Sequence, residues 1–218
     1  MTATPIRAVI FDLDGVLVDS FAVMKEAFAA AYAEVVGPGP APFAEYSRHL
    51  GRYFPDIMTI MGLPQEMLEP FVRESQRLAH RVPLFDGVPQ LLAGLHERGV
   101  RLAVATGKSG ERARSLLGGL GVLDRFQAVI GSDEVARPKP APDIVHRALE
   151  VLDADARDAV MVGDAWIDLA SAQRAGVRAV AAMWAAVDVE ALMARSPDAV
   201  LHHPWQMLEL FAPPVSAG

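Results

Sequence analysis

Short apolar runs alternate with helical patterns along most of this chain, and this alternation constrains its fold more than any other feature. Each run is free of charge and rich in Val, Ile, Leu or Ala, which is typical of strands buried in a parallel sheet. Strands that alternate with helices form βαβ units and therefore favour one parallel sheet. The predicted strands are residues 8–11, 102–105, 128–130, 159–162 and 179–182.

Three segments between these runs predict helices that cross over the sheet. Apolar residues fall on one helical face at 89–98 and again at 142–152. A third helix at 168–175 is followed by Gly176, where we expect a left-handed C-cap. The fold class is therefore α/β, with a doubly wound, Rossmann-like parallel-sheet core.

Residues 21–82 interrupt the alternation, because they show helical spacing but no convincing strand. Breaks in the helical pattern are expected at 37–40, at 62–64 and at Pro70. A block of about 60 residues is far longer than the usual connection, so it predicts an inserted all-helical cap whose two linkers form a hinge. The expected division is a core of residues 1–20 and 83–218, a cap of residues 21–82, and linkers near 18–20 and 83–87.

Composition narrows the classes of protein that fit. The net charge of −7 and the lack of a basic stripe with interleaved aromatics argue against nucleic-acid binding. No apolar stretch is long enough to span a membrane, and the sequence starts without a secretory-signal pattern. The chain has no cysteine, which is compatible with a reducing cytoplasm. We therefore expect a cytoplasmic monomer or homodimer whose partner is a small molecule.

Two acids follow the first predicted strand, at the edge where open α/β sheets bind ligands. Asp12 and Asp14 lie in Asp-Leu-Asp-Gly, and a turn at Gly15 lets both face one reacting atom. Such a pair could hold a metal, or one acid could attack while the other moves protons. A functionless acidic turn is the alternative for this motif taken alone.

Other strand ends carry groups suited to an anion or a metal. Thr106 and the N–H groups after it would meet an anion, although Thr106 could also serve only as the N-cap of the next helix. Prolines on both sides stiffen Lys139, whose ammonium suits a phosphate oxygen. Asp164 ends a strand, and Asp168 lies one helical turn later. Together these groups indicate Mg²⁺, a bound phosphate and phosphoryl transfer.

The motifs resemble those of phosphatases of the haloacid dehalogenase superfamily, in the subgroup similar to phosphoglycolate phosphatase, and the helical insert resembles their cap. The likeness covers nearly the whole chain. It implies a Mg²⁺-dependent phosphomonoester hydrolase that forms an aspartyl-phosphate on a small phosphorylated metabolite. The matching motifs are Asp12-Leu13-Asp14-Gly15, Thr106, Lys139 and Gly163-Asp164 with Asp168.

This resemblance implies a role for each residue. Asp12 is the nucleophile, and Asp14 protonates the leaving alcohol and then activates water. We expect cap closure to desolvate Asp14 and raise its pKa. Lys139 offsets the repulsion between Asp12 and the phosphoryl group. The implied Mg²⁺ ligands are Asp12, the Asp14 carbonyl and Asp164, with Asp168 in or near the outer shell. Thr106 and Gly107 are the implied phosphate-binding residues, and Lys108 is a further substrate-binding residue.

Departures from the superfamily narrow the reaction further. Asp14 argues against a dehalogenase, because those enzymes lack this acid. Related mutases carry a His where Met24 stands, and a thioether cannot relay a proton, so a phosphatase is preferred over a mutase. Residues 49–57 and 105–109 resemble phosphatases associated with 3-amino-5-hydroxybenzoate synthesis, which implies a sugar or aminosugar phosphate in antibiotic biosynthesis. Phosphoglycolate is the alternative substrate.

Two questions stay open: which cap residues contact the substrate, and whether the chain is a signalling domain instead of an enzyme. Residues 45–53 are candidates for reading the substrate, with Arg52 foremost, although they could also form a solvated helix face. Trp166 could line the cleft or simply pack. A phospho-acceptor signalling domain is the alternative class, but the DxD spacing and the insert argue against it. We expect the cap's core to contain Met58, Met61 and Met67.

Overall fold

The computed structural model describes residues 6–211, and their strands form one parallel sheet in the order β3-β2-β1-β4-β5-β6. All five predicted strands are present, which confirms the α/β fold class. The sixth strand was not predicted, because it is a three-residue edge strand with no run of buried residues. The strands are β1 (Ala8–Phe11), β2 (Arg101–Thr106), β3 (Ala128–Gly131), β4 (Ala159–Gly163), β5 (Arg178–Ala182) and β6 (Ala199–Leu201).

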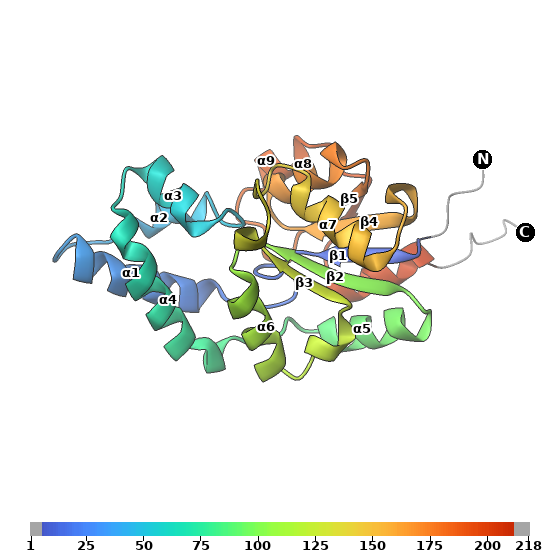
Figure 1. The fold of residues 1–218 in the computed structure, drawn as a ribbon, viewed down its shortest axis with the longest axis horizontal. Helices are drawn as coiled ribbons and strands as arrows, with labels where there is room; N and C mark the ends of the chain where they lie inside the picture. Colours follow the sequence, from blue (N-terminus) through green and yellow to red (C-terminus); the bar gives the residue numbers. More distant parts are fainter. Residues whose placement is uncertain (1–5, 212–218) are drawn as a thin grey trace, which may run out of the picture.

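Helices cover both faces of the sheet (Figure 1). Side chains alternate along β1, so Val9 and Phe11 pack under one helical layer and Ala8 and Ile10 under the other. The left-handed conformation predicted at Gly176 is confirmed by its φ of 72°. One layer contains α5 (Val88–Glu97), α6 (Gly110–Gly119) and η6 (Pro204–Phe211), and the other contains α7 (Asp143–Leu152), α8 (Trp166–Arg174) and α9 (Val189–Met193).

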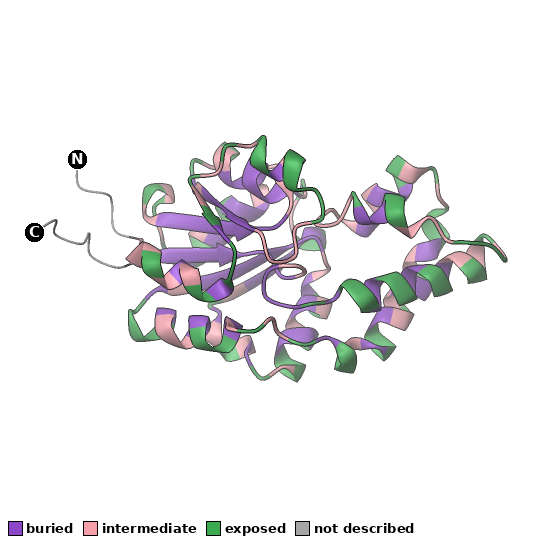
Figure 2. Ribbon diagram, turned by 180° about the vertical axis from the view of Figure 1, so that it is seen from behind, coloured by how far each residue is buried: buried purple, intermediate pink, exposed green. Residues whose placement is uncertain are grey.

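A separate group of helices lies at one end of the sheet, between β1 and α5 in the chain (Figure 1). Its buried side chains form their own apolar cluster, with inward faces buried and outer faces exposed (Figure 2). The predicted cap core is confirmed, since Met58 and Met67 are buried and Met61 packs against them. The elements are α1 (Phe21–Val35), α2 (Phe43–Ser47), α3 (Phe54–Met61), η1 (Gln65–Met67), α4 (Leu68–Arg77) and η2 (Ala79–Arg81).

The expected break at Pro70 is wrong, because this proline lies in the first turn of α4. N–H groups in a first turn have no partner within the helix, so a proline there removes no hydrogen bond. The remaining one-turn 3-10 helices connect core elements. They are η3 (Leu123–Arg125), η4 (Ser132–Glu134) and η5 (Ala156–Asp158).

The two chain segments that join the cap to the core pair with each other. The Asp19 N–H donates to the Pro83 carbonyl (3.0 Å), and the Phe85 N–H donates to the Leu17 carbonyl (3.0 Å). An isolated antiparallel bridge between Val18 and Leu84 lies between these bonds. The connection is therefore a short two-stranded ribbon next to the carboxyl end of β1.

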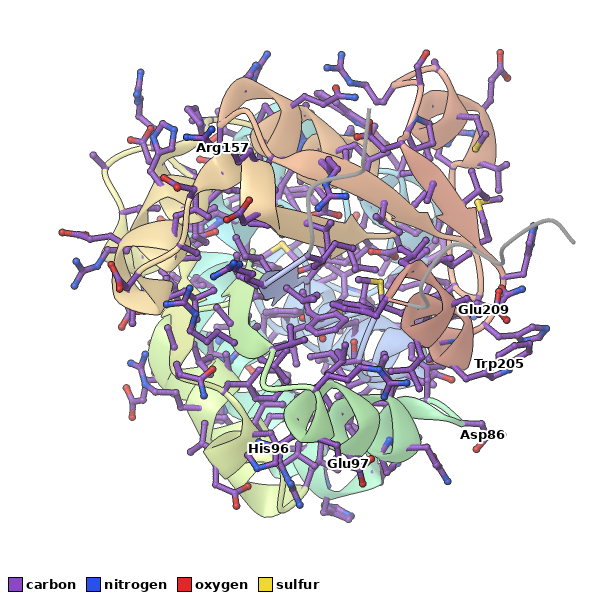
Figure 3. The ribbon with its side chains drawn as sticks, turned by 90° about the vertical axis from the view of Figure 1, so that its right-hand side faces the viewer. Asp86, His96, Glu97, Arg157, Trp205 and Glu209 are labelled. Carbon is purple, nitrogen blue, oxygen red and sulfur yellow. The ribbon has the colours of Figure 1, made fainter. Side chains whose placement is uncertain are left out.

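Polar and aromatic side chains point outward around α5 and η6. Figure 3, seen from the side opposite the cap, shows Asp86, His96 and Trp205 pointing away from the core there, and Trp205 is 49% exposed. Across residues 6–211, no helix has the length and apolar character needed to cross a membrane. The buried polar residues lie mainly at the carboxyl end of the sheet, towards the cap.

Candidate active site

The carboxyl ends of three adjacent strands bring the predicted motifs together. β1 lies between β2 and β4, so Asp12 after β1, Thr106 at the end of β2 and Asp164 after β4 meet at one edge. Lys139 enters from the loop before α7, and Asp168 from the first turn of α8. All five side chains are buried although they are polar, and buried polar groups need partners, so the contacts they make define the site.

Lys139 is the centre of a buried ionic network. Its Nζ donates to Asp168 Oδ1 (2.6 Å), to Asp12 Oδ1 (3.0 Å) and to the Ala105 carbonyl (3.1 Å). Burial lowers the pKa of Lys139, but the Asp12 and Asp168 carboxylates outweigh burial and hold it above its ordinary value. The ammonium therefore stays charged and fixes the position of the Asp12 carboxylate.

Three carboxylates beside this lysine form a group that fits a divalent cation. Asp12, Asp164 and Asp168 each offer an oxygen within 4.8 Å of the others, and no other such group occurs among residues 6–211. Burial raises the pKa of Asp12 to about 7, with Lys139 opposing and Asp168 and Asp14 adding to the rise. Burial and the neighbouring carboxylates also raise the pKa of Asp164 well above its ordinary value.

The fit to Mg²⁺ rests on an unsatisfied atom and on the donor set. Asp12 Oδ2 is buried and has no hydrogen-bond partner among the described residues. A buried carboxylate oxygen without a donor is costly, and an all-oxygen donor set with few protein ligands is the kind that Mg²⁺ prefers. The ammonium of Lys139 therefore leaves part of the negative charge of these carboxylates unpaired, and a divalent cation would neutralise it.

A glycine is required at position 15, because the loop after β1 passes close to the loop after β4. Gly15 has a φ of 84°, and a Cβ added there would lie 2.1 Å from Asp164 Oδ2. Only glycine accommodates both the left-handed turn and the carboxylate. This turn lets Asp12 and Asp14 leave the strand and approach the acids after β4.

Asp14 has partners different from those of Asp12. Ser20 Oγ donates to Asp14 Oδ1 (2.5 Å), and Lys108 Nζ lies 3.2 Å from Asp14 Oδ2. Burial raises the pKa of Asp14, but Lys108 and the Ser20 hydrogen bond outweigh it, so the pKa lies below its ordinary value. The expectation that desolvation raises this pKa is therefore wrong for this conformation. Asp14 is held here as a carboxylate.

Thr106 lies at the start of a loop that precedes α6. Its alternative role as a simple N-cap is wrong, because Ser109 is the N-cap residue and α6 begins at Gly110. Thr106 is buried and its Oγ1 accepts the Lys108 N–H (3.2 Å). The loop residue Gly107 faces the cap: an added Cβ would lie 2.3 Å from the Gly51 carbonyl oxygen. The cap is thus seated directly on this loop.

A cavity of about 580 Å³ lies between the cap and this edge of the sheet. Asp12, Thr106 and Lys108 line it from the core, and Met24 and Arg52 line it from the cap. Its volume is within the range of sites for drug-sized molecules, about 300–1,000 Å³.

The cap segment 45–53 contributes only part of its length to the cavity. Arg52 lines it and its guanidinium lies 5.2 Å from the centre of the Trp166 ring, while Tyr46 lines it with a ring that stacks on Phe28. Glu45 and His49 are not among the lining residues. Trp166 borders a small neighbouring pocket and packs against Arg52.

Sequence reasoning missed several residues of this site, and three of them bear on its chemistry. Ser20 holds Asp14 from the linker, Trp184 lines the cavity and donates its ring N–H to the Val16 carbonyl (3.1 Å), and Arg112 of α6 lines the cavity. Only Arg112 gave a usable signal, since it lies one turn beyond Lys108. Ser20 and Trp184 have no motif that distinguishes them from ordinary linker and core residues.

A parallel-sheet core, a helical cap and a buried lysine–carboxylate centre at the strand ends together define a capped hydrolase of the phosphatase class. Residues 9–182 match the family model described as haloacid dehalogenase-like hydrolase, and the chain belongs to this family. Relatives named for phosphatase activity support the same class, so the protein is a phosphatase of this family.

Individual relatives cover most of the chain. A phosphoglycolate phosphatase of Rhodospirillum rubrum is 35% identical and covers 80% of this chain and 78% of its own. The protein named probable phosphatase IndB of Dickeya dadantii is 34% identical over 88% of each chain. The solved structure of a haloacid dehalogenase-like hydrolase, SP0104 from Streptococcus pneumoniae, aligns with a TM-score of 0.84 at 26% identity, over 97% of this chain and 100% of its own.

Proposed function

We propose that the protein is a Mg²⁺-dependent phosphomonoester hydrolase that works through an aspartyl-phosphate on Asp12. The observation that carries this proposal is the buried Asp12 carboxylate, which is fixed by Lys139 on one oxygen and lacks a partner on the other. A fixed, desolvated carboxylate beside an ammonium is suited to nucleophilic attack on an anionic phosphate.

The chain's own residues account for the reaction. An Asp12 oxygen forms a bond to phosphorus as the bond to the leaving oxygen breaks, and Asp14 gives that oxygen a proton. Asp14 then takes a proton from water, which attacks phosphorus and releases inorganic phosphate from Asp12. Thr106 and the Gly107 N–H hold the phosphoryl oxygens.

Metal and lysine offset the charge that builds up in this reaction. Asp12, Asp164 and the Asp14 carbonyl would hold Mg²⁺, with Asp168 beside it, and the bound ion would neutralise the transferring phosphoryl group. Lys139 supplies a second positive charge on the Asp12 side. The pKa of Asp14 is held below its ordinary value by Lys108 and Ser20, so this residue must gain a proton or change partners before it can act as an acid.

For the substrate we propose a phosphorylated sugar or aminosugar in a pathway of the 3-amino-5-hydroxybenzoate type. The cavity of about 580 Å³ supports a molecule larger than the two-carbon phosphoglycolate, which remains the alternative. Met24 lines the cavity where related mutases carry a His, so net hydrolysis is favoured over phosphoryl return. The cysteine-free composition is compatible with a cytoplasmic enzyme.

The decisive experiment is turnover of p-nitrophenyl phosphate with and without Mg²⁺. We expect turnover that requires Mg²⁺ and that falls at least about 10⁴-fold in Asp12→Asn, because the variant lacks the nucleophile. Asp124→Asn is the matched control, since Asp124 is exposed in η3 and should leave turnover unchanged. A stable phosphorylated protein without turnover would identify a signalling domain instead.

A substrate screen then tests the finer proposal. Sugar phosphates, aminosugar phosphates, hexose 1-phosphates and phosphoglycolate are ranked by kcat/KM. A sugar or aminosugar phosphate should rank first, with no interconversion of hexose 1- and 6-phosphates. If phosphoglycolate leads by orders of magnitude, the biosynthetic assignment is wrong although the phosphatase mechanism stands.

A further inference from the structure

Arg112 places a guanidinium from the core inside the substrate cavity. It lies on the first turn of α6 and lines the cavity, and its Nη2 donates to Ser75 Oγ of cap helix α4 (2.7 Å). The guanidinium also lies over the Phe71 ring, 5.6 Å from its centre. A side chain of the core thus reaches across the cavity to the cap.

This positive charge has no anionic partner within ion-pair distance among residues 6–211. Its one hydrogen bond goes to a neutral hydroxyl, whereas a guanidinium offers five N–H donors. Arg114, two residues further along α6, shows the usual arrangement, because its Nη2 pairs with Glu134 at 2.8 Å. A desolvated charge without a counter-ion is unfavourable, and the open side of Arg112 is the cavity.

The charges around Arg112 leave positive charge unmatched on the leaving-group side of the cavity. Burial lowers the pKa of Arg112 and that of Lys108, and in both cases the Asp14 carboxylate opposes the shift. Two cations therefore share one carboxylate. Asp19 and Glu111 also line the cavity, but neither lies within ion-pair distance of Arg112.

We propose that Arg112 is a specificity-determining residue that binds a second oxyanion, a carboxylate or a phosphate, on the leaving-group part of the substrate. Guanidinium groups bind such oxyanions with paired, charge-assisted hydrogen bonds. The inference rests on the proposed phosphomonoester hydrolysis and deepens it: among sugar phosphates, the preferred substrate carries a second acidic group, as in a phosphorylated sugar acid or a sugar bisphosphate, and is not a neutral sugar phosphate.

Matched substrate pairs test this preference in the Mg²⁺-loaded full-length protein. 6-Phosphogluconate is compared with glucose 6-phosphate for a carboxylate, and fructose 1,6-bisphosphate with fructose 6-phosphate for a phosphate. The wild type should favour the acidic member of at least one pair, and the pair it favours identifies the oxyanion. Arg112→Met, which keeps an apolar stem over Phe71, should reduce that preference about 30-fold. The preference is a ratio of kcat/KM values within one pair, so a loss common to both substrates cancels.

Two further variants separate recognition from structure. Arg112→Lys should restore part of the preference, because it returns the charge without the planar fork. Arg114→Met, on the same helix but paired with Glu134, should leave the preference unchanged. Should Arg112→Met fail to fold by circular dichroism, Arg112→Gln takes its place. The inference is overturned if the wild type prefers the neutral member of both pairs, or if Arg112 variants slow all substrates equally.

Equilibrium binding gives a readout that does not depend on turnover. Binding of 4-phosphonobutyrate and of butylphosphonate to the Mg²⁺-loaded protein is measured by calorimetry. The wild type should bind the carboxylated phosphonate at least about tenfold more tightly if the carboxylate pair was favoured, and Arg112→Met should remove the difference. If this discrimination is present but no phosphomonoester is hydrolysed, the proposed function is wrong while the role of Arg112 in binding an oxyanion stands. If hydrolysis is present but neither kinetics nor binding discriminates, the role of Arg112 fails alone.

Discussion

Lys139 stabilises the site by sharing one positive charge between two buried carboxylates. Its side chain and those of Asp12 and Asp168 are at most 1% exposed, so water screens none of the three charges. Removing one partner from a buried ion pair leaves an uncompensated charge and destabilises a protein by about 3–5 kcal/mol. Bound Mg²⁺ would offset the same carboxylates from another side.

Lys139→Met should therefore reduce the free energy of unfolding by about 3–5 kcal/mol in EDTA. Excess Mg²⁺ should restore part of that loss, because the ion replaces some of the missing positive charge. Urea unfolding with EDTA and with Mg²⁺ measures both effects. Lys25→Met is the matched control on the exposed face of α1 and should change stability by less than about 0.5 kcal/mol. Equal losses with and without Mg²⁺ would contradict a metal site beside Lys139.

Single residues differ in how far the sequence reveals them. Asp12 and Lys139 were predictable because a buried strand or flanking prolines fix where their side chains emerge. The partners of Asp14 were not, because Ser20 and Lys108 reach it only after the chain turns at Gly15, and the sign of its pKa shift depends on them. The position of the Arg112 guanidinium in the cavity was not predictable either. It depends on a contact with α4 of the cap, which comes from a distant part of the chain.

Among the structural elements, the loop after β2 forms a direct contact between the cap and the carboxyl edge of the sheet. Gly107 has Gly51 and Arg52 carbonyl oxygens where a side chain would be, at 2.3 and 2.7 Å from an added Cβ. These are backbone atoms, which cannot move aside as a flexible side chain can. The observed contact of the cap with this loop thus requires glycine at position 107.

Gly107→Ala should lower kcat/KM for p-nitrophenyl phosphate by about 10- to 100-fold. The added methyl group overpacks the contact between cap and loop and destabilises the conformation with the cap in place by about 1–3 kcal/mol. The backbone N–H remains, and we expect the linkers to let the cap open and relieve the overpacking, so the melting temperature should change little. Steady-state kinetics and thermal unfolding measure the two effects. Gly119→Ala is the matched control, because an added Cβ there meets nothing within 4 Å. Full activity in Gly107→Ala would show that catalysis does not need this contact.

Elements were predictable where the pattern of burial is regular. β1 and β4 are buried at every residue, and the crossover helices were found within about two residues of their ends. β6 escaped because one of its three residues is exposed and it lies at the sheet edge. Pro70 misled because a proline is equally compatible with a break and with a first turn, and only the position of α4 distinguishes them.

At the scale of the whole molecule, most buried cap residues form an apolar cluster of their own, while Val23, Leu78 and Val82 at the base of the cap join the cluster on one face of the sheet. Phe28, Met58 and Met67 belong to the cap's cluster, whereas strand and crossover-helix residues form two others on the faces of the sheet. The paired linkers at Val18 and Leu84 connect the two parts of the chain. Such an arrangement favours independent opening of the less stable part, which hydrogen exchange detects as a distinct cooperative unit.

Met58→Ala should therefore unfold the cap locally without weakening the sheet. Met58 is 0% exposed, and truncating a buried methionine costs about 2–5 kcal/mol. Amides of α1, α3 and α4 should exchange faster by native-state hydrogen exchange, while those of β1 and β4 keep their protection. Met161→Ala, at an equally buried methionine of β4, should instead reduce the protection of the sheet. If Met58→Ala lowers sheet protection as much as cap protection, the two parts unfold as one unit, and cap opening then requires rigid rotation about the linkers and not local unfolding.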